Sequence, residues 1–137
     1  MSLVLDASMS IAWMFEDECT PAARRVMLRV EEGGATVPSL WRLEVANVLR
    51  TAVRRGRCDE DFVDRALIDL GGLAIALDRE TDARAWSDIR RLSREEGLTL
   101  YDAAYLELAI RLDRPLASAD GALLDAARRR GLEVLTA

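Results

Sequence analysis

The sequence predicts an α/β domain in three layers, in which helices flank a short five-stranded parallel sheet. Short apolar runs recur along the chain, and longer amphipathic stretches separate them. A connection long enough to hold a helix joins parallel strands through a right-handed crossover. The 137-residue chain has no internal repeat and no linker rich in proline, glycine or serine, so residues 1–137 are expected to form a single domain.

The expected strands are short apolar runs bounded by turn or helix signals. They lie at residues 3–5, 35–37, 73–77, 115–118 and 133–135. The expected helices fill the intervals between them. They run from near Ser8 through Met14, from Pro21 to about Val30, from Pro38-Ser39 to Gly56, from Asp59 through Leu70, from Ala83 to Gly97, from Thr99 through Ile110, and from Asp120 to Gly131.

Start and stop residues delimit most of these helices. Pro21 suits the first turn of a helix, and Asp59 and Thr99 are good N-cap residues. Apolar side chains at helical spacing, such as those of Leu40, Leu43 and Val48, give each helix a face to bury. Glycine, which ends helices readily, follows the predicted helices at Gly33, Gly56, Gly97 and Gly131.

Four acidic residues lie where this fold would gather them. In open α/β sheets, ligands bind beyond the carboxyl ends of the strands, where the strand order reverses. Asp6 directly follows the first strand and Asp120 closely follows the fourth, so the two meet if those strands are neighbours. Asp102 lies in the first turn of the helix that leads to the fourth strand, and Glu44 lies on the helix after the second. We expect all four to face one cleft.

Carboxylates crowded into one cleft need a cation or a proton. The chain contains no histidine, so the commonest acid/base group and metal ligand near neutral pH is missing. Four carboxylates repel one another unless some are protonated or a cation neutralises them. Mg²⁺ or Mn²⁺ suits ligands that are all oxygen, and its usual chemistry is on phosphate esters.

Each acid also has a structural alternative. Asp6, Asp102 and Asp120 each lie near a helix start and suit a capping role. Glu44 interrupts an apolar helix face, which favours an ion pair with Arg42 or Arg50, or simple exposure to solvent. Two hydroxyl residues lie two positions from a site aspartate and either hydrogen-bond a carboxylate or cap a helix; they are Ser8 and Ser118.

The charge balance limits the kinds of partner. The formal net charge is −5, and all nineteen basic residues are arginine. This acidity argues against binding nucleic acid through the whole surface, but it is compatible with a local arginine patch. The candidates for such a patch are Arg42, Arg54 and Arg57. Arginine also binds phosphate through two parallel hydrogen bonds, which lysine cannot do.

The cysteines and the apolar runs favour a cytoplasmic protein. Cys19 and Cys58 have no histidine near them and too few companions for a zinc site, so they are expected to be reduced. The first residues lack the basic segment and the long apolar run of a signal peptide. No stretch approaches the roughly 20 apolar residues of a membrane span.

Four stretches, taken in order, resemble one family. The chain is similar to the PIN-domain ribonucleases, and within them to the VapC-type toxins of toxin–antitoxin modules. The resemblance covers essentially the whole chain, and it is strongest at residues 4–8, 38–49, 98–109 and 115–120. It implies a three-layer PIN-like domain. One departure is Gly121, because many relatives follow the last aspartate with a basic or polar residue.

The resemblance implies a function and its residues. The acidic quartet of the family carries over onto Asp6, Glu44, Asp102 and Asp120, and its small hydroxyl onto Ser118. It implies endonucleolytic cleavage of RNA with Mg²⁺ or Mn²⁺, held chiefly by Asp6 and Asp102, and a role as the toxin of a toxin–antitoxin pair. The implied partners are a small cognate antitoxin and a second copy of the chain in a homodimer. The alternative is a PIN-fold module that binds RNA or a partner and has little or no nuclease activity.

A cluster of large side chains suggests where the antitoxin binds. Trp13, Met14 and Phe15 follow one another on a short helix, too close together for all three to point inward easily. We expect them, with apolar residues of the next helix, to form part of an exposed groove that accepts an apolar antitoxin segment.

Overall fold

The computed structural model describes residues 2–137 and confirms the predicted α/β architecture. Five parallel strands form one sheet in the order β3-β2-β1-β4-β5. The strands are β1 (Leu3–Leu5), β2 (Ala35–Val37), β3 (Ile75–Leu77), β4 (Leu116–Ser118) and β5 (Val134–Thr136). In the register of the sheet, Val4 of β1 pairs with Thr36 of β2 and with Leu116 of β4.

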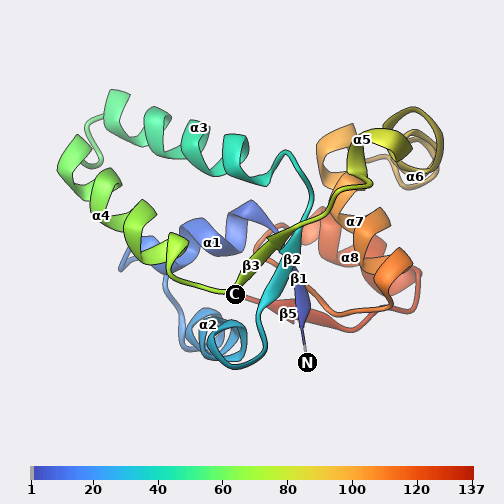
Figure 1. Ribbon diagram of the computed structural model, residues 1–137, viewed down its shortest axis with the longest axis horizontal. Coiled ribbons are helices and arrows are strands. Elements are labelled where there is room, and N and C mark those ends of the chain that lie inside the picture. The colour runs from blue at the N-terminus through green and yellow to red at the C-terminus, as the bar shows by residue number, and fades with distance from the viewer. Residues whose placement is uncertain (1) are drawn as a thin grey trace.

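Helices cover both faces of the sheet, as Figure 1 shows. One layer consists of α1 (Ala7–Met14), α2 (Pro21–Gly33), α3 (Trp41–Arg54) and α4 (Glu60–Gly71). The other consists of α5 (Thr81–Arg84), the π-helical turn η1 (Ala85–Ile89), α6 (Arg90–Glu96), α7 (Leu100–Leu112) and α8 (Gly121–Arg129). Among residues 2–137, no helix combines the length and the apolar composition needed to cross a membrane.

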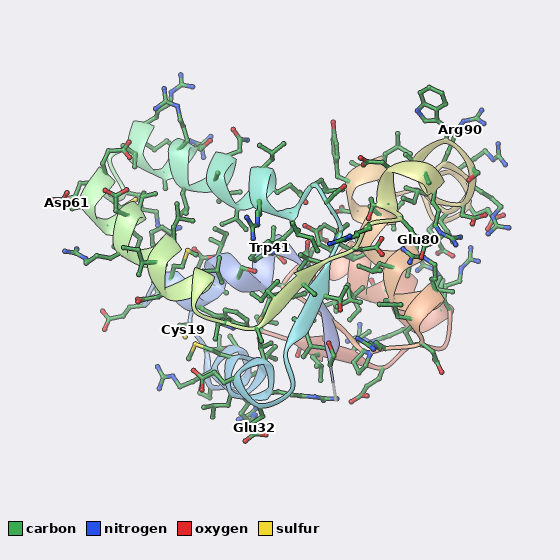
Figure 2. All side chains as sticks on the ribbon, viewed as in Figure 1. Cys19, Glu32, Trp41, Asp61, Glu80 and Arg90 are labelled. Atoms are coloured by element: carbon green, nitrogen blue, oxygen red, sulfur yellow. The ribbon has the colours of Figure 1, made fainter. Side chains whose placement is uncertain are left out.

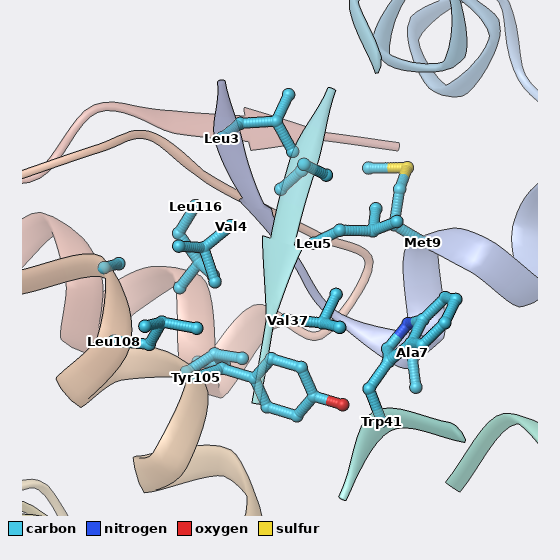
Figure 3. Close-up of a cluster of buried hydrophobic side chains, with 14 of the residues drawn as sticks. Leu3, Val4, Leu5, Ala7, Met9, Val37, Trp41, Tyr105, Leu108 and Leu116 are labelled. Carbon is cyan, nitrogen blue, oxygen red and sulfur yellow. The ribbon is translucent and has the colours of Figure 1, made fainter. Parts of the chain in front are cut away.

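The central strand is buried on both faces. Leu3, Val4 and Leu5 are completely shielded from solvent. Successive residues of a strand point to opposite faces, and Figure 3 shows Val4 on the side of Leu108 and Leu5 on the side of Met9. Strands covered on both sides read as continuous apolar runs, which is why this sequence signal was clear.

The helix expected over residues 83–97 is interrupted. Trp86 is 89% exposed, while Ile89 and Leu92 are buried. The π-helical turn η1 adds a residue to one helical turn, which rotates Trp86 away from the buried stripe.

Trp41 closes the core at the start of α3. Its side chain lies in the middle of the molecule, whereas Glu32, Asp61 and Arg90 lie at the periphery (Figure 2). The indole N–H of Trp41 donates a hydrogen bond to Ser10 Oγ over 3.1 Å, so its polar atom has a partner inside the core. This contact fixes the beginning of α3 against α1, and Glu44 lies one turn further along α3.

Candidate active site

The strand order places the reversal point of the sheet between β1 and β4. From β1 the chain continues outward through β2 and β3, and it then returns to add β4 and β5 on the other side of β1. Asp6 follows β1 directly, and its backbone N–H donates to the carbonyl oxygen of Ala117 in β4 over 2.9 Å. The expected neighbourhood of the first and fourth strands is confirmed, and it brings Asp6 and Asp120 to the same edge of the sheet.

Asp6 is buried and is held by two serine hydroxyls. The residue is only 4% exposed. Its Oδ2 accepts hydrogen bonds from Ser8 Oγ over 2.5 Å and from Ser118 Oγ over 2.7 Å. Burial raises the pKa of Asp6 in spite of these hydrogen bonds, because the loss of hydration outweighs them. Asp6 makes no side-chain cap bond to α1, so the capping alternative is wrong for this residue.

The same two serines also fix the loop that carries Asp120. Ser8 Oγ accepts from the backbone N–H of Ala119 over 2.9 Å, and Ser118 Oγ accepts from that of Asp120 over 2.9 Å. Each serine therefore connects the carboxylate of Asp6 to the segment after β4. This arrangement sets the position of Asp120 relative to Asp6.

Asp120 does cap α8, as one of the sequence alternatives proposed. Its Oδ1 accepts from the backbone N–H groups of Ala122 over 3.0 Å and of Leu123 over 3.5 Å. The cap bonds are made by one carboxylate oxygen. Capping and membership of the acidic cluster are therefore compatible in the same side chain.

Tyr105 is the partner of Glu44. Its hydroxyl donates to Glu44 Oε1 over 2.6 Å, and Figure 3 shows its ring pointing from α7 toward the start of α3, where Trp41 lies. Burial raises the pKa of Glu44, and the negative charges of Asp6 and Asp102 raise it further. The ion pair expected with Arg42 or Arg50 is wrong.

Tyr105 was missed in the sequence, although one signal could have indicated it. It stands three residues after Asp102, so the two side chains lie on the same side of α7. A buried tyrosine also needs a hydrogen-bond partner for its hydroxyl, and Tyr105 is completely buried on a helix that is otherwise mostly apolar.

Asp102 has a strongly raised pKa. Burial, the negative charges of Asp6 and Asp120, and a hydrogen bond with Asp120 raise the pKa of Asp102 to about 6. The cap of α7 is Thr99, whose Oγ1 accepts from the backbone N–H of Asp102 over 3.1 Å. This bond is half of the capping box that the sequence suggested, and a side-chain hydrogen bond with Thr99 lowers the pKa of Asp102 without offsetting the other effects, so capping and membership of the acidic cluster are compatible here too.

The structure brings the four acids within electrostatic reach of one another. The negative charge of Asp6 raises the pKa values of Glu44 and Asp102, and the charge of Asp120 raises the pKa of Asp6. All donors are oxygens, which is the set that Mg²⁺ and Mn²⁺ prefer. Over residues 2–137, however, no three acidic or cysteine side chains are arranged closely enough to hold one ion together.

Comparison with known proteins decides the family. Residues 3–129 match the PIN domain family. The chain belongs to that family. It is 33% identical over 125 residues to Ribonuclease VapC3 of Pyrobaculum aerophilum, an alignment that covers 91% of this chain and 94% of that protein. The crystal structure of PAE2754 from Pyrobaculum aerophilum matches with a TM-score of 0.70 at 25% identity, over 98% of this chain and 92% of that one. The predicted resemblance to the PIN family is confirmed.

A groove lies between α1, α2 and α4 of this PIN domain. It encloses about 380 Å³, and its apolar wall includes Trp13, Met14, Met27 and Phe62. Trp13 and Met14 are half-buried and line the groove as predicted. Phe15 is only 7% exposed and lies outside this groove, so its part of the prediction is wrong.

Proposed function

We propose that this PIN-domain protein is a Mg²⁺- or Mn²⁺-dependent endoribonuclease and the toxin of a toxin–antitoxin pair. Family membership and the similarity to a protein named Ribonuclease VapC3 support the proposal. The observation that carries it is the convergence of Asp6, Glu44, Asp102 and Asp120 from four separate elements at the reversal point of the sheet. Within the described part of the chain, no arginine pairs with any of the four.

The carboxylates are the residues that would hold the cation. Asp6 and Asp102 would hold it chiefly, and Glu44 and Asp120 would complete the site. The bound ion would polarise the phosphodiester and lower the pKa of an attacking water. Hydrogen bonds fix the carboxylates for this purpose, since Ser8 and Ser118 orient Asp6, and Tyr105 orients Glu44.

Proton balance accompanies cation binding. The pKa of Asp102 is about 6, so its carboxyl retains a proton for part of the time just below neutral pH. Binding of a cation replaces the proton as the neutralising charge, so cation affinity rises with pH across this range.

The first experiment is an RNA cleavage assay with Mn²⁺ and with EDTA. The wild type and Asp64→Asn are expected to cleave single-stranded RNA in Mn²⁺ and to stop in EDTA, because Asp64 is exposed on α4 away from the cluster. Asp102→Asn and Glu44→Gln are expected to be inactive. Folded wild-type protein that binds RNA or a partner without cleaving RNA in Mn²⁺ would favour the alternative, a PIN-fold binding module.

The groove between α1, α2 and α4 is the proposed antitoxin site. Its apolar wall suits an amphipathic helix of a small partner, and Glu31, Arg65 and Asp69 supply polar groups to its lining. We expect loss of antitoxin binding when the wall is changed and the carboxylates are left intact. Copurification of the two proteins measures this.

Two further parts of the proposal concern assembly and location. The prediction that Leu43 lies on the buried face of its helix is wrong, because Leu43 is 77% exposed. Leu43 and Ile68, which is 73% exposed, leave apolar surface for a second copy to cover in a homodimer. Light scattering tests the dimer, and a monomeric mass at all concentrations would exclude it. The protein is proposed to act in the cytoplasm, where its free thiols Cys19 and Cys58 stay reduced.

A further inference from the structure

The third helix and the turn after it form the basic part of an acidic protein. Residues 42–57 hold five of the nineteen arginines and a single acid, Glu44. The other residues hold fourteen arginines and 23 acids. Among residues 2–137, the ion pairs leave Arg55 without a carboxylate partner. A positively charged segment therefore begins beside the carboxylate cluster and extends away from it.

One stripe of this segment leads directly from the cluster. Residues three, four, seven and eleven positions after Glu44 lie on the same face of a helix as Glu44. The polar members of this stripe are Asn47 and Thr51, and Arg55 follows directly after α3. At 1.5 Å per residue, Arg55 lies about 16 Å from Glu44 along the axis. Figure 1 shows α3 and α1 extending from the sheet on the same side.

A hollow of about 230 Å³ opens at the far end of this stripe. Its lining includes Asn47, Thr51 and Arg55 from α3 and its end, together with Phe15 and Arg57. Val48 and Ala52 also line it, so an amide, a hydroxyl and two guanidinium groups surround a hollow whose wall is otherwise apolar. The charges set it apart from the groove between α1, α2 and α4, because Arg55 and Arg57 line the hollow, whereas Arg65 lines the groove together with Glu31 and Asp69.

Arg57 is held flat in this hollow. Its guanidinium carbon lies 3.9 Å from the centroid of the Phe15 ring. Its N–H groups donate to Asp17 over 2.8 and 2.9 Å and to Glu18 over 2.7 Å. The hydrogen-bonding edges of Arg57 are thus occupied, which argues against the predicted role in binding phosphate. The Arg57 side chain is still 39% exposed, which leaves part of its guanidinium open to a ligand.

We propose that this hollow is a nucleotide subsite for single-stranded RNA, and the proposal rests on the ribonuclease function above. Arg55 binds a backbone phosphate, a base stacks on the face of Arg57, and Asn47 and Thr51 hydrogen-bond the edge of that base. Bases stack on guanidinium planes and aromatic rings only when they are unpaired, so the ligand is a single strand. The separation from Glu44 places the bound nucleotide a few positions from the phosphate that is cleaved.

Charge and shape together favour RNA over an acidic protein segment. A guanidinium without a carboxylate partner suits either a phosphate or a carboxylate. A flat platform beside an amide and a hydroxyl suits a planar base with polar edges, because such a base uses both features at once. The stripe that connects the platform with the carboxylate cluster gives one strand a continuous path to both.

The test compares two arginines of the same helix region by RNA binding. Fluorescence anisotropy with a labelled single-stranded RNA oligonucleotide, in EDTA and low salt, gives the affinity without cleavage. Arg55→Gln is expected to weaken binding about tenfold and to reduce the salt dependence by about one counterion. Arg50→Gln, the matched control on another face of α3, is expected to change affinity less than about twofold.

A second variant tests the stacking platform. Arg57→Lys keeps the charge but removes the planar face. An RNA carrying 2-aminopurine, whose fluorescence is quenched on stacking, is expected to be quenched by the wild type at one position and not by Arg57→Lys. Melting curves confirm that each variant is folded, and Arg50→Gln again serves as the control.

The outcomes separate this subsite from the ribonuclease function. Equal effects of Arg55→Gln and Arg50→Gln overturn the subsite even if the wild type cleaves RNA. Loss of antitoxin binding in Arg55→Gln with unchanged RNA affinity also overturns it and identifies the hollow as a protein contact. A wild type that binds RNA through Arg55 but does not cleave it supports the subsite and refutes the nuclease. Failure of the wild type to bind RNA overturns the subsite as well.

Discussion

Asp102→Asn is expected to stabilise the metal-free protein while it abolishes RNA cleavage. The substitution removes one negative charge and nearly preserves shape. The new amide N–H donates to Asp120. The cap of α7 is unaffected, because Thr99 accepts from the backbone N–H of residue 102.

The expected gain follows from the pKa of Asp102. Its value of about 6, against a usual 3.8, corresponds to at most about 3 kcal/mol between the two ionisation states. The group is only half-buried, so solvent screening reduces this to about 1–2 kcal/mol. Because the pKa is raised in the folded state, the ionised carboxyl costs nothing below about pH 4 and its full cost applies above about pH 7.

Denaturant unfolding in EDTA measures the effect across this pH range. Asp102→Asn and the wild type are expected to have similar free energies of unfolding near pH 4, and the variant is expected to be more stable by about 1–2 kcal/mol near pH 7. Asp64→Asn, the matched control, is expected to show no such rise. If the proposed cation site is correct, Mn²⁺ at about 100 times its dissociation constant is expected to stabilise the wild type by about 2.7 kcal/mol and to stabilise Asp102→Asn less.

Two results would refute this reasoning. A difference between Asp102→Asn and the wild type that does not grow with pH would show that charge repulsion is not the cause. Cleavage at wild-type rates in both Asp102→Asn and Glu44→Gln would show that the carboxylates are not the catalytic site, whatever their effect on stability.

Three further substitutions test the surroundings of the site and the antitoxin groove. Tyr105→Phe removes the donor to Glu44 and is expected to lower the RNA cleavage rate about 10- to 100-fold, with unfolding free energy changed by about 1 kcal/mol or less. Ser118→Ala leaves Asp6 with one hydroxyl donor and is expected to cost about 1–2 kcal/mol in urea unfolding; an unchanged midpoint would contradict this. Met27→Asp places a charge in the groove wall and is expected to prevent copurification with the antitoxin while leaving cleavage intact, and a complex that survives the change would refute the groove assignment.

The strands and the position of the reversal point could be predicted because their signals are local. A fully buried strand such as β1 is a continuous apolar run. The side chains of Thr20, Asp59 and Thr99 each cap a helix, because each accepts a hydrogen bond from the backbone N–H of the residue three positions later. The crossover rule then limits how such elements can connect. Asp6 and Asp120 could be placed together only on the condition that the first and fourth strands are neighbours, which the structure confirms.

Contacts between distant segments could not be predicted in this way. Glu44 and Tyr105 are separated by 61 positions, and no local pattern indicates that the hydroxyl of one helix reaches the carboxylate of another. The arginines near Glu44 in sequence seemed better partners, yet helical geometry turns Arg42 to the opposite face of α3. Phe15 was misplaced for a similar reason, since Phe62 and Arg57 cover its ring from two other segments.

The acidic cluster lowers the stability of the fold locally, and the buried core around it offsets that loss. Burial raises the pKa values of Asp6 and Glu44, so both are less stable as anions in the protein than in water. Strands β1 and β4 meet beside Asp6, and every residue of both strands is buried. Hydroxyl donors from Ser8, Ser118 and Tyr105 orient the carboxylates without neutralising them. An arginine in the same place would stabilise the fold and remove the charge that attracts a cation, so the absence of such a pair over residues 2–137 is the feature that favours a functional site over a structural one.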